Sequence, residues 1–540
     1  MKLPDEDRLL GAVHHILADI AFRRGDKTLC RTEAEIARAC YVRTGTLSGV
    51  EAIERVLGMI DITDRAASLK HLSISNALTE ILREQVPADD TGLSRAGFFA
   101  RRAYVNERMI ELLLQEDKSI EAMAVLETAK GRSLQDVLAG TKIHDDSTEV
   151  RSVQDILTNW PKDVAAIEYF VGSENCWGFL ILDGKVEVFS LLDDGKPISS
   201  RELIALVQQF LSDSELQARK MSGRVRNREG FGREWEPALY RLRTCLIPDA
   251  VLEKLRISQV ENVLIVPQHV LHYLPFVALV VEQDKINNDP KVMPMPKFVL
   301  DEPFNVFQAP SLVVWDSLQQ LENRPINSFA VVGISTFSQA ASLAGVKKDV
   351  ENINKAFARE RVQTIVEDNA TKDALETILG QRGLLFVATH GMNNPQNPLQ
   401  GLLLLRSGKG NDDTITAEEI FETTVGTDLV VLSACYSGLA EQSPLPGDDL
   451  FGIQRALLHS GARAVVAGMW DVYDSTGPII IDGLLKHLAE GESAPAALAG
   501  AQRDFMKQQR AEGATNPWTH PYFWAVYTLT GDGRVNCEKK

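Results

Sequence analysis

Two apolar runs, each ending at a reactive side chain with a glycine close behind, constrain the fold of this chain more than any other feature. The first run ends at Thr389-His390-Gly391, and the second ends at Ser433-Ala434-Cys435, with Gly438 three residues further on. Continuous apolar runs of this length are typical of strands buried on both faces of a parallel sheet. In open α/β sheets, reactive groups gather beyond the carboxyl ends of the strands. We therefore expect His390 and Cys435 to lie together at one edge of a parallel sheet.

The combination of a thiol and an imidazole predicts nucleophilic catalysis. A cysteine thiol has an ordinary pKa near ~8.5 and is mostly protonated at neutral pH, so a nucleophilic cysteine needs a neighbouring imidazole or a positive field. Glycine lets backbone amides approach a ligand closely, and the amides of Gly391 and Cys435 are candidates for an oxyanion hole. One such donor is worth roughly 10²- to 10³-fold in rate. The predicted reaction is acyl transfer, most simply proteolysis, although two tight turns at strand ends would also account for the glycines.

The other cysteines and histidines lack this setting. Of the six cysteines, only Cys435 follows a buried-strand pattern and precedes a glycine. Five of the ten histidines lie in helical patterns, whereas His272, within residues 271–276, remains a second candidate for direct chemistry. Scattered cysteines without paired spacing argue against a disulfide framework and indicate a reducing compartment.

Length and charge restrict the class of protein. A chain of 540 residues exceeds the roughly 250 to 300 residues that one core supports, so two or three domains are expected. The formal net charge of -17 opposes attraction to phosphate backbones, and direct binding of nucleic acid is not expected. No apolar run reaches the roughly 20 residues of a membrane helix, and the acidic N-terminus is unlike a secretion signal. We expect a cytoplasmic location.

Hydrophobic periodicity divides the chain into three predicted regions. Residues 1–150 have helical spacing and no strand signal, and the helical pair at 103–115 and 119–138 has the proportions of one tetratricopeptide-like unit. An ordinary helical bundle is the alternative. Residues 160–325 mix strands with helices and form an α/β region.

The third predicted region comprises residues 326–536. Strands and helices alternate there, including a strand at 401–405, and this alternation predicts a parallel sheet that is covered by helices on both faces. Within the preceding region, Asp183-Gly184 lies between two strand patterns and predicts a hairpin turn.

Several unlike segments of the chain together resemble one family. In order, they are AIEYFVG, NVLIVP with LHYLPF, FVATHG followed by NPLQGLLLL, LVVLSACYSG, PGDDLFGIQRALLHSGARAVVAGMWDV and HPYFWAVYTLTGD. They are similar to the CHAT family, a caspase-like domain often attached to tetratricopeptide repeats and related to separase, over roughly residues 165–532. The segment AMAVLETAKGRSLQDVL resembles the last helix often found before such domains.

The resemblance implies a caspase-like cysteine protease. It assigns the catalytic dyad to His390 and Cys435 and the oxyanion hole to the amides of Gly391 and Cys435. No third triad member is implied, because in this clan the histidine mainly protonates the leaving amine. The resemblance also implies that residues 160–325 form an inactive caspase-like half before the active half at 326–536. No metal and no cofactor are expected.

Three further residues are candidates for binding the substrate. Asp471 and Asp474 lie in a Trp-Asp-Val segment that resembles separase near its substrate pocket, where carboxylates would favour Arg or Lys before the scissile bond. Capping of the helix that begins near Gly477 is the alternative role. Ser433 stands where metacaspases place the aspartate that selects basic side chains, which argues against a calcium-dependent, metacaspase-like specificity.

The leading hypothesis is a cysteine endopeptidase that cleaves a specific protein partner after regulatory activation. Resemblance to bacterial CHAT proteases implies a role in antiphage defence or gasdermin-type cell death. The helical N-terminal region is expected to bind an activating or recruiting protein. Two alternatives remain: a catalytically silent caspase-like scaffold that acts as an interaction module, and a thiol acyltransferase.

Overall fold

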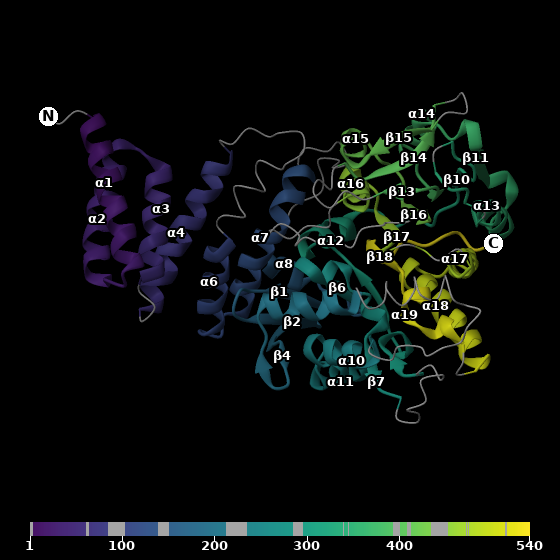
Figure 1. Ribbon diagram of the computed structural model, residues 1–540, viewed down its shortest axis with the longest axis horizontal. Coiled ribbons are helices and arrows are strands. Elements are labelled where there is room, and N and C mark those ends of the chain that lie inside the picture. Colours follow the sequence, from purple (N-terminus) through teal and green to yellow (C-terminus); the bar gives the residue numbers. More distant parts are fainter. Residues whose placement is uncertain are drawn as a thin grey trace. The chain divides into compact units, whose positions relative to one another are not determined.

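The chain folds into two compact units, Met1–Ala129 and Lys130–Lys540, with separate hydrophobic cores. Figure 1 shows the computed structural model. The described residues are 4–60, 64–84, 103–138, 151–211, 235–284, 295–338, 340–343, 345–392, 400–407, 412–433, 452–470, 472, 475–513 and 516–540.

Helices make up the described part of the N-terminal unit. They are α1 (Pro4–Arg23), α2 (Lys27–Thr44), α3 (Leu47–Ile60), α4 (Arg65–Glu84), α6 (Ala103–Leu114) and the beginning of α7 (Ser119–Leu138). The links between α1, α2 and α3 are short because Gly25 and Gly45 adopt the left-handed conformation that ends a helix, with φ of 74° and 67°. The predicted helical pair is confirmed by α6 and α7.

Small side chains let the first three helices approach one another closely. Ala18 and Ala21 of α1 are buried against Ala34 of α2 and Ile53 of α3 in one core cluster. Gly11 of α1 packs against the ring of Tyr41, where an added Cβ would lie only 3.0 Å from the nearest ring atom. The inner face of α1 is therefore lined by small residues.

Among the described residues of the C-terminal unit, eleven strands form one sheet in the order β11-β10-β12-β16-β17-β18-β9-β6-β1-β2-β3. Their bounds along the chain are β1 (Val164–Val171), β2 (Cys176–Leu182), β3 (Lys185–Ser190), β6 (Asn262–Val266), β9 (Asn305–Gln308), β10 (Phe329–Gly333), β11 (Val362–Val366), β12 (Leu384–Ala388), β16 (Leu429–Ser433), β17 (Ala464–Gly468) and β18 (Tyr527–Gly531). Strands β11, β10, β12, β16 and β17 are parallel, and β18 is antiparallel to β17. Because β9, β6 and β1 follow the direction of β18, the strands of the two halves run in opposite directions.

Helices cover both faces of the C-terminal half of this sheet, which confirms the predicted α/β class. They are α13 (Gly345–Ala356), α14 (Lys372–Leu379), α15 (Ala417–Glu422), α16 (Ile453–Ser460), α17 (Gly477–Ala489), α18 (Ala494–Ala511) and α19 (Pro521–Trp524). Helices α14, α15 and α16 share a core with alternate strand residues such as Val332, Val387 and Leu432. Helix α13 contributes nothing to that core and packs against α17 instead. Because side chains alternate between the two faces of a strand, the residues next to these in sequence, including Ser433, face the side of the sheet on which α13 lies.

The first half of the sheet carries shorter elements. They are α8 (Val153–Thr158), a helix at residues 200–211, α10 (Trp235–Leu246), α11 (Asp249–Ser258), η1 (His269–Tyr273), η2 (Phe276–Ala278), η3 (Val299–Asp301), α12 (Leu312–Gln320) and the two-stranded pairs β4 (Leu192–Asp193) with β5 (Lys196–Pro197) and β7 (Val280–Glu282) with β8 (Lys297–Phe298). Asp183 and Gly184 join β2 to β3 with positive φ angles of 49° and 71°, so the predicted hairpin turn is confirmed.

The strand expected at 401–405 is present, but it does not join the parallel sheet, so the prediction of its partner strands was wrong. Strand β14 (Leu402–Arg406) pairs antiparallel with β13 (Gly391–Met392) and β15 (Asp412–Thr416) in a separate sheet. Its residues alternate between half-buried and buried at the start, which is typical of an antiparallel strand with one covered face. The remaining short turns are η4 (Arg359–Arg361), η5 (Glu367–Asn369) and η7 (Pro517–Thr519).

Within the described ranges, every helix falls short of the length or the apolar character that crossing a bilayer requires.

A buried charge cluster fixes the end of β18. Asp532 is fully buried and accepts hydrogen bonds from Arg463 at 2.5 Å, Arg534 at 2.9 Å and Gln319 at 3.2 Å. Burial alone would raise the pKa of Asp532, but the hydrogen bonds and charges of the two arginines lower it. Since Gln319 belongs to α12 and Arg463 precedes β17, this carboxylate ties the two halves of the sheet together.

We expect Asp532→Ala to lower the free energy of unfolding by about 3–5 kcal/mol, because the substitution leaves a buried arginine charge without its partner. Urea denaturation measures the change. Glu538→Ala is the matched control: it removes an ion pair to Arg361 in which both side chains are half-exposed, and we expect little change. Equal losses in the two variants would contradict the structural role of Asp532.

Candidate active site

Strand register sets the starting positions of the two predicted catalytic residues. Strands β12 and β16 are parallel neighbours, and Ala388 at the end of one is paired with Ser433 at the end of the other. His390 lies two residues beyond Ala388, and Cys435 lies two residues beyond Ser433. Cys435 falls outside the described residues, so its pairing with His390 stays a prediction.

The imidazole of His390 is held on one side. Its Nε2 atom lies 2.7 Å from the carbonyl oxygen of Ala341, and its ring lies against the ring of Phe337 with centroids 4.7 Å apart. Both neighbours belong to the segment between β10 and α13. Because a carbonyl only accepts, Nε2 must carry the hydrogen of this bond, which leaves Nδ1 as the nitrogen available for proton exchange.

The backbone around His390 is fixed by the small antiparallel sheet. The carbonyl of His390 accepts from the amide of Leu404 at 2.9 Å, and the buried hydroxyl of Thr389 donates to the carbonyl of Leu404 at 2.7 Å. The next pair along this ladder is Gly391 with Leu403. Hydrogen-bonded and non-hydrogen-bonded pairs alternate in an antiparallel ladder, so the amide of Gly391 points away from β14. The predicted oxyanion donor is therefore not used by that ladder.

The segment that supports His390 is itself anchored by charged side chains. Arg406 pairs with Asp412 at 2.6 Å, donates to the carbonyl of Thr336, and lies 5.8 Å from the centroid of the Phe337 ring. Glu367 accepts from the amide of Ser335 at 3.0 Å and from the hydroxyl of Thr336 at 2.9 Å. Burial alone would raise the pKa of Glu367, but these hydrogen bonds lower it. The platform of His390 is thus held from β14 and from the end of β11.

Ser433, one of the predicted substrate-binding residues, contacts a buried carboxyl group. Its hydroxyl donates to Asp349 of α13 at 3.4 Å, while the other carboxyl oxygen of Asp349 has no partner. Asp349 is 3% exposed, and burial raises its pKa to about 7, against a smaller opposing effect of the Ser433 hydrogen bond. The sequence did not single out this residue, because it follows two lysines in an amphipathic helix and resembles a solvent-facing acid.

Five described cysteines form no disulfide and are buried, namely Cys30, Cys40, Cys176, Cys245 and Cys537. Burial raises the pKa of Cys30 to about 11, and that of Cys245 and Cys537 to about 12. A thiol with such a pKa is not a nucleophile at neutral pH.

His272, the second candidate for direct chemistry, is unsuited to proton donation. Burial lowers its pKa to about 3, assisted by the charge of Lys130, so its imidazole is neutral at physiological pH. Both ring nitrogens lack hydrogen-bond partners within the described structure. His272 also follows β6, whose direction opposes that of β12.

Asp471 and Asp474 lie outside the described residues, so their predicted role in the substrate pocket stays a prediction. Their neighbour Trp470 donates its indole hydrogen to the carbonyl of Tyr522 at 3.0 Å and stacks on the Tyr522 ring. The N-cap position of α17 is occupied by Thr476, so neither aspartate fills it.

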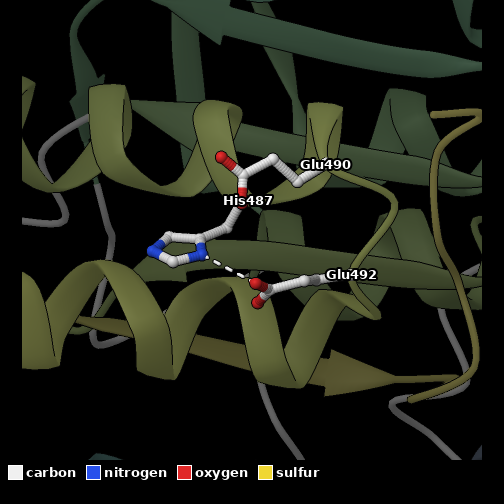
Figure 2. Close-up of side chains that lie close together, drawn as sticks. All are labelled: His487, Glu490 and Glu492. Carbon is white, nitrogen blue, oxygen red and sulfur yellow. Dashed lines mark hydrogen bonds and ion pairs between the residues drawn. The ribbon is translucent and has the colours of Figure 1, made fainter. Parts of the chain in front are cut away.

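A separate cluster of titratable groups lies at the end of α17. Figure 2 shows His487 with Glu490 and Glu492, whose ligand atoms lie close enough together to hold a metal ion. Nδ1 of His487 lies 3.0 Å from Glu492, and Nε2 lies 3.2 Å from Asp504. Burial alone would lower the pKa of His487, but the two carboxylates raise it. Because a metal ligand must be neutral imidazole, this arrangement favours an ion-pair cluster over a metal site.

Comparisons with protein-family models and with curated proteins each identify related sequences. The CHAT domain model matches residues 236–532. Tetratricopeptide repeat protein 28 of Mus musculus is 29% identical to this chain over 123 residues, and the protein of the same name from Homo sapiens is 30% identical over 140 residues. These matches cover 23% and 26% of this chain. They cover only 5% of each relative, so the chain spans a small part of the length of these relatives.

Among solved structures, the separase–securin complex of Saccharomyces cerevisiae is similar with a TM-score of 0.55 at 10% identity. The similarity covers 97% of this chain and 44% of the yeast chain. A second crystal structure of that complex gives a TM-score of 0.46 at 12% identity, over 92% and 40% of the two chains. The first of these likenesses, at 10% identity, concerns the fold alone and confirms the separase-related fold expected from the sequence.

We expect Asp349→Asn to stabilise the protein increasingly as the pH rises from 6 to 7. The pKa of Asp349 is raised on folding from 3.8 to about 7, so the folded state binds the proton more tightly and wild-type stability falls as the pH rises through this window. The amide cannot ionise and escapes this loss. The melting temperatures of the two proteins between pH 6 and 8 measure the effect.

Asp373→Asn, at an exposed position on α14, is the control and should give a difference that does not change with pH. The claim that the buried Asp349 carboxyl is protonated below about pH 7 would be refuted if the difference in melting temperature between Asp349→Asn and wild type did not change from pH 6 to 8.

Proposed function

Because this chain belongs to the CHAT-domain family, we propose that it is a cysteine endopeptidase in which His390 and Cys435 form the catalytic dyad. The single observation that carries the proposal is the register of β12 and β16, which pairs Ala388 with Ser433. Neighbouring strands lie about 4.8 Å apart. His390 and Cys435 each follow their paired strand residue by two positions, so the two segments that carry them leave the sheet side by side. An imidazole and a thiol on such backbones are within reach of one peptide bond.

The proposed reaction follows the chemistry of a thiol dyad. Nδ1 of His390 takes the proton of the Cys435 thiol. The resulting thiolate attacks the carbonyl carbon of the scissile peptide bond, and the electron pair of the C=O bond moves to the carbonyl oxygen. The amides of Gly391 and Cys435 donate hydrogen bonds to this oxyanion. When the C–N bond breaks, Nδ1 of His390 gives its proton to the leaving amine and a thioester remains. Water then attacks the thioester with His390 as the base, and the thiol is released.

The hydrogen bond from His390 to Ala341 supports this assignment of roles. It fixes the ring tautomer and orientation, which an acid that must protonate a leaving amine requires. His390 is half-exposed, so a substrate has access to the ring. In contrast, both ring nitrogens of His272 are buried without a hydrogen-bond partner in the described structure, and its lowered pKa keeps the imidazole neutral.

We propose that Ser433, Asp471 and Asp474 bind the substrate. Ionised carboxylates in the pocket would favour Arg or Lys before the scissile bond. The contact of Ser433 with the buried Asp349 supports its proposed place beside the reaction centre, because it fixes the side chain at the end of β16.

The substrate is proposed to be a specific protein, cleaved after a regulatory event that the helical N-terminal region receives. The yeast neighbour in fold is a complex of separase with securin, and this supports control of such a domain by a protein partner. Antiphage defence or gasdermin-type cell death is the proposed setting. A cytoplasmic location fits the described cysteines, which form no disulfide.

Labelling of the native protein with iodoacetamide tests the nucleophile. We expect one reactive thiol, Cys435, because the five described cysteines are buried. Peptide mass spectrometry identifies the labelled residue. We expect Cys435→Ala to abolish rapid labelling and Cys245→Ser to leave it unchanged.

Cleavage of a proteome-derived peptide library, with new N-termini read by mass spectrometry, tests the activity. We expect no cleavage by Cys435→Ala, and a loss of roughly 10²- to 10⁴-fold in rate for His390→Ala. Cys245→Ser again serves as the control. Identical cleavage patterns from wild type and Cys435→Ala would reject the protease and leave the scaffold, whereas transfer of the acyl group to an amine instead of water would indicate an acyltransferase.

A further inference from the structure

The outer face of α1 carries an exposed apolar stripe. Leu9, Val13, Ile16 and Ile20 are 69%, 47%, 60% and 42% exposed. They recur at intervals of four, three and four residues, which places them on one side of the helix. Large apolar side chains in one continuous row are unusual on a solvated helix and mark an interaction surface.

The stripe lies opposite the face with which α1 packs into its own unit. That inner face consists of Gly11, Ala18 and Ala21, which are buried against α2 and α3. Nothing in the described part of the N-terminal unit covers the outer row. The spacing of the stripe is that of the a and d positions of a two-stranded helical seam.

The charges that flank the stripe are arranged symmetrically about its centre. The midpoint of the stripe lies between His14 and His15, and Glu6 and Arg23 are equally far from this midpoint on the same side of the helix. Both side chains are exposed, and neither forms an ion pair with another described residue. The helix is therefore acidic at the start of the stripe and basic at its end.

We propose that the α1 stripe is the interface with a second copy of this chain, in an antiparallel α1–α1 pair related by a two-fold axis. About the midpoint of the stripe, Leu9 of one copy faces Ile20 of the other, and Val13 faces Ile16. Glu6 of each copy then faces Arg23 of its partner. A two-fold interface requires such self-complementarity, because the same surface contributes both sides.

The charges favour this arrangement over two others. In a parallel pair, Glu6 would face Glu6 and Arg23 would face Arg23, and both contacts would be repulsive. A helix that lies on an anionic membrane carries Lys and Arg along its polar face, whereas α1 begins with three acidic residues within its first four. One helix pair buries less than the roughly 1,200–2,000 Å² of a standard interface, so we expect a dimer with a Kd in the micromolar range.

Sedimentation velocity on the full chain, from about 1 to 100 µM at about 0.15 M salt, tests the interface. We expect a dimer whose Kd rises at least about tenfold in Ile16→Glu, since each copy then buries a charge at the centre of the seam. Ile257→Glu on α11 is the control, because Ile257 is 71% exposed and lies in the other unit. It should dimerise like wild type.

Exchange of the end charges tests the orientation. We expect Glu6→Arg and Arg23→Glu each to weaken the dimer several-fold, and the double variant to recover it, because opposite charges face each other again. Circular dichroism of each variant checks that α1 remains helical. A wild-type monomer at every concentration, or a dimer that Ile16→Glu leaves intact, would overturn the interface. A double variant as weak as the single ones would overturn the antiparallel pairing.

Discussion

The in-register parallel pairing of β12 with β16 is the constraint on which the structure of the candidate site depends. Both strands are fully apolar up to their last residues, and burial on both faces is typical of interior strands of a sheet. The register leaves little freedom, because a slip by one residue would turn each side chain to the opposite face. Ser433 would then face away from Asp349, and the residues beyond the two strand ends would no longer match.

Two sheets fix the position of His390: the large sheet through β12, and the small antiparallel sheet through β13 and β14. Strand β13 begins directly after His390, and its pairing with β14 fixes the backbone of the proposed base from one side. The segment after β10 fixes the ring from the other side through Ala341 and Phe337. Elsewhere in the described chain, burial raises the pKa of Cys245 to about 12 and lowers that of His520 to about 3. Such groups are poor nucleophiles and proton donors at neutral pH.

Local apolar patterns predicted the alternation of strands and helices in the C-terminal half, to which β10, β11 and α14 belong. Long-range partners were not predictable in this way. Strand β9 is a short segment, Asn305–Gln308, with polar residues at both ends, and the continuous sheet depends on its single paired residue with β18. Asp349 was missed because its burial arises from tertiary packing of α13. The platform under His390 was missed because Arg406 and Asp412 meet only through the antiparallel pairing of β14 with β15.

The most direct test of the central claim is the distance between the imidazole of His390 and the sulfur of Cys435. The bifunctional reagent 1,3-dibromoacetone alkylates a reactive thiol and then a second nucleophile that lies within a few ångströms. After proteolysis and mass spectrometry, the account predicts one cross-linked peptide pair that joins Cys435 to His390. A product in which Cys435 carries the reagent and His390 remains unmodified would contradict the account.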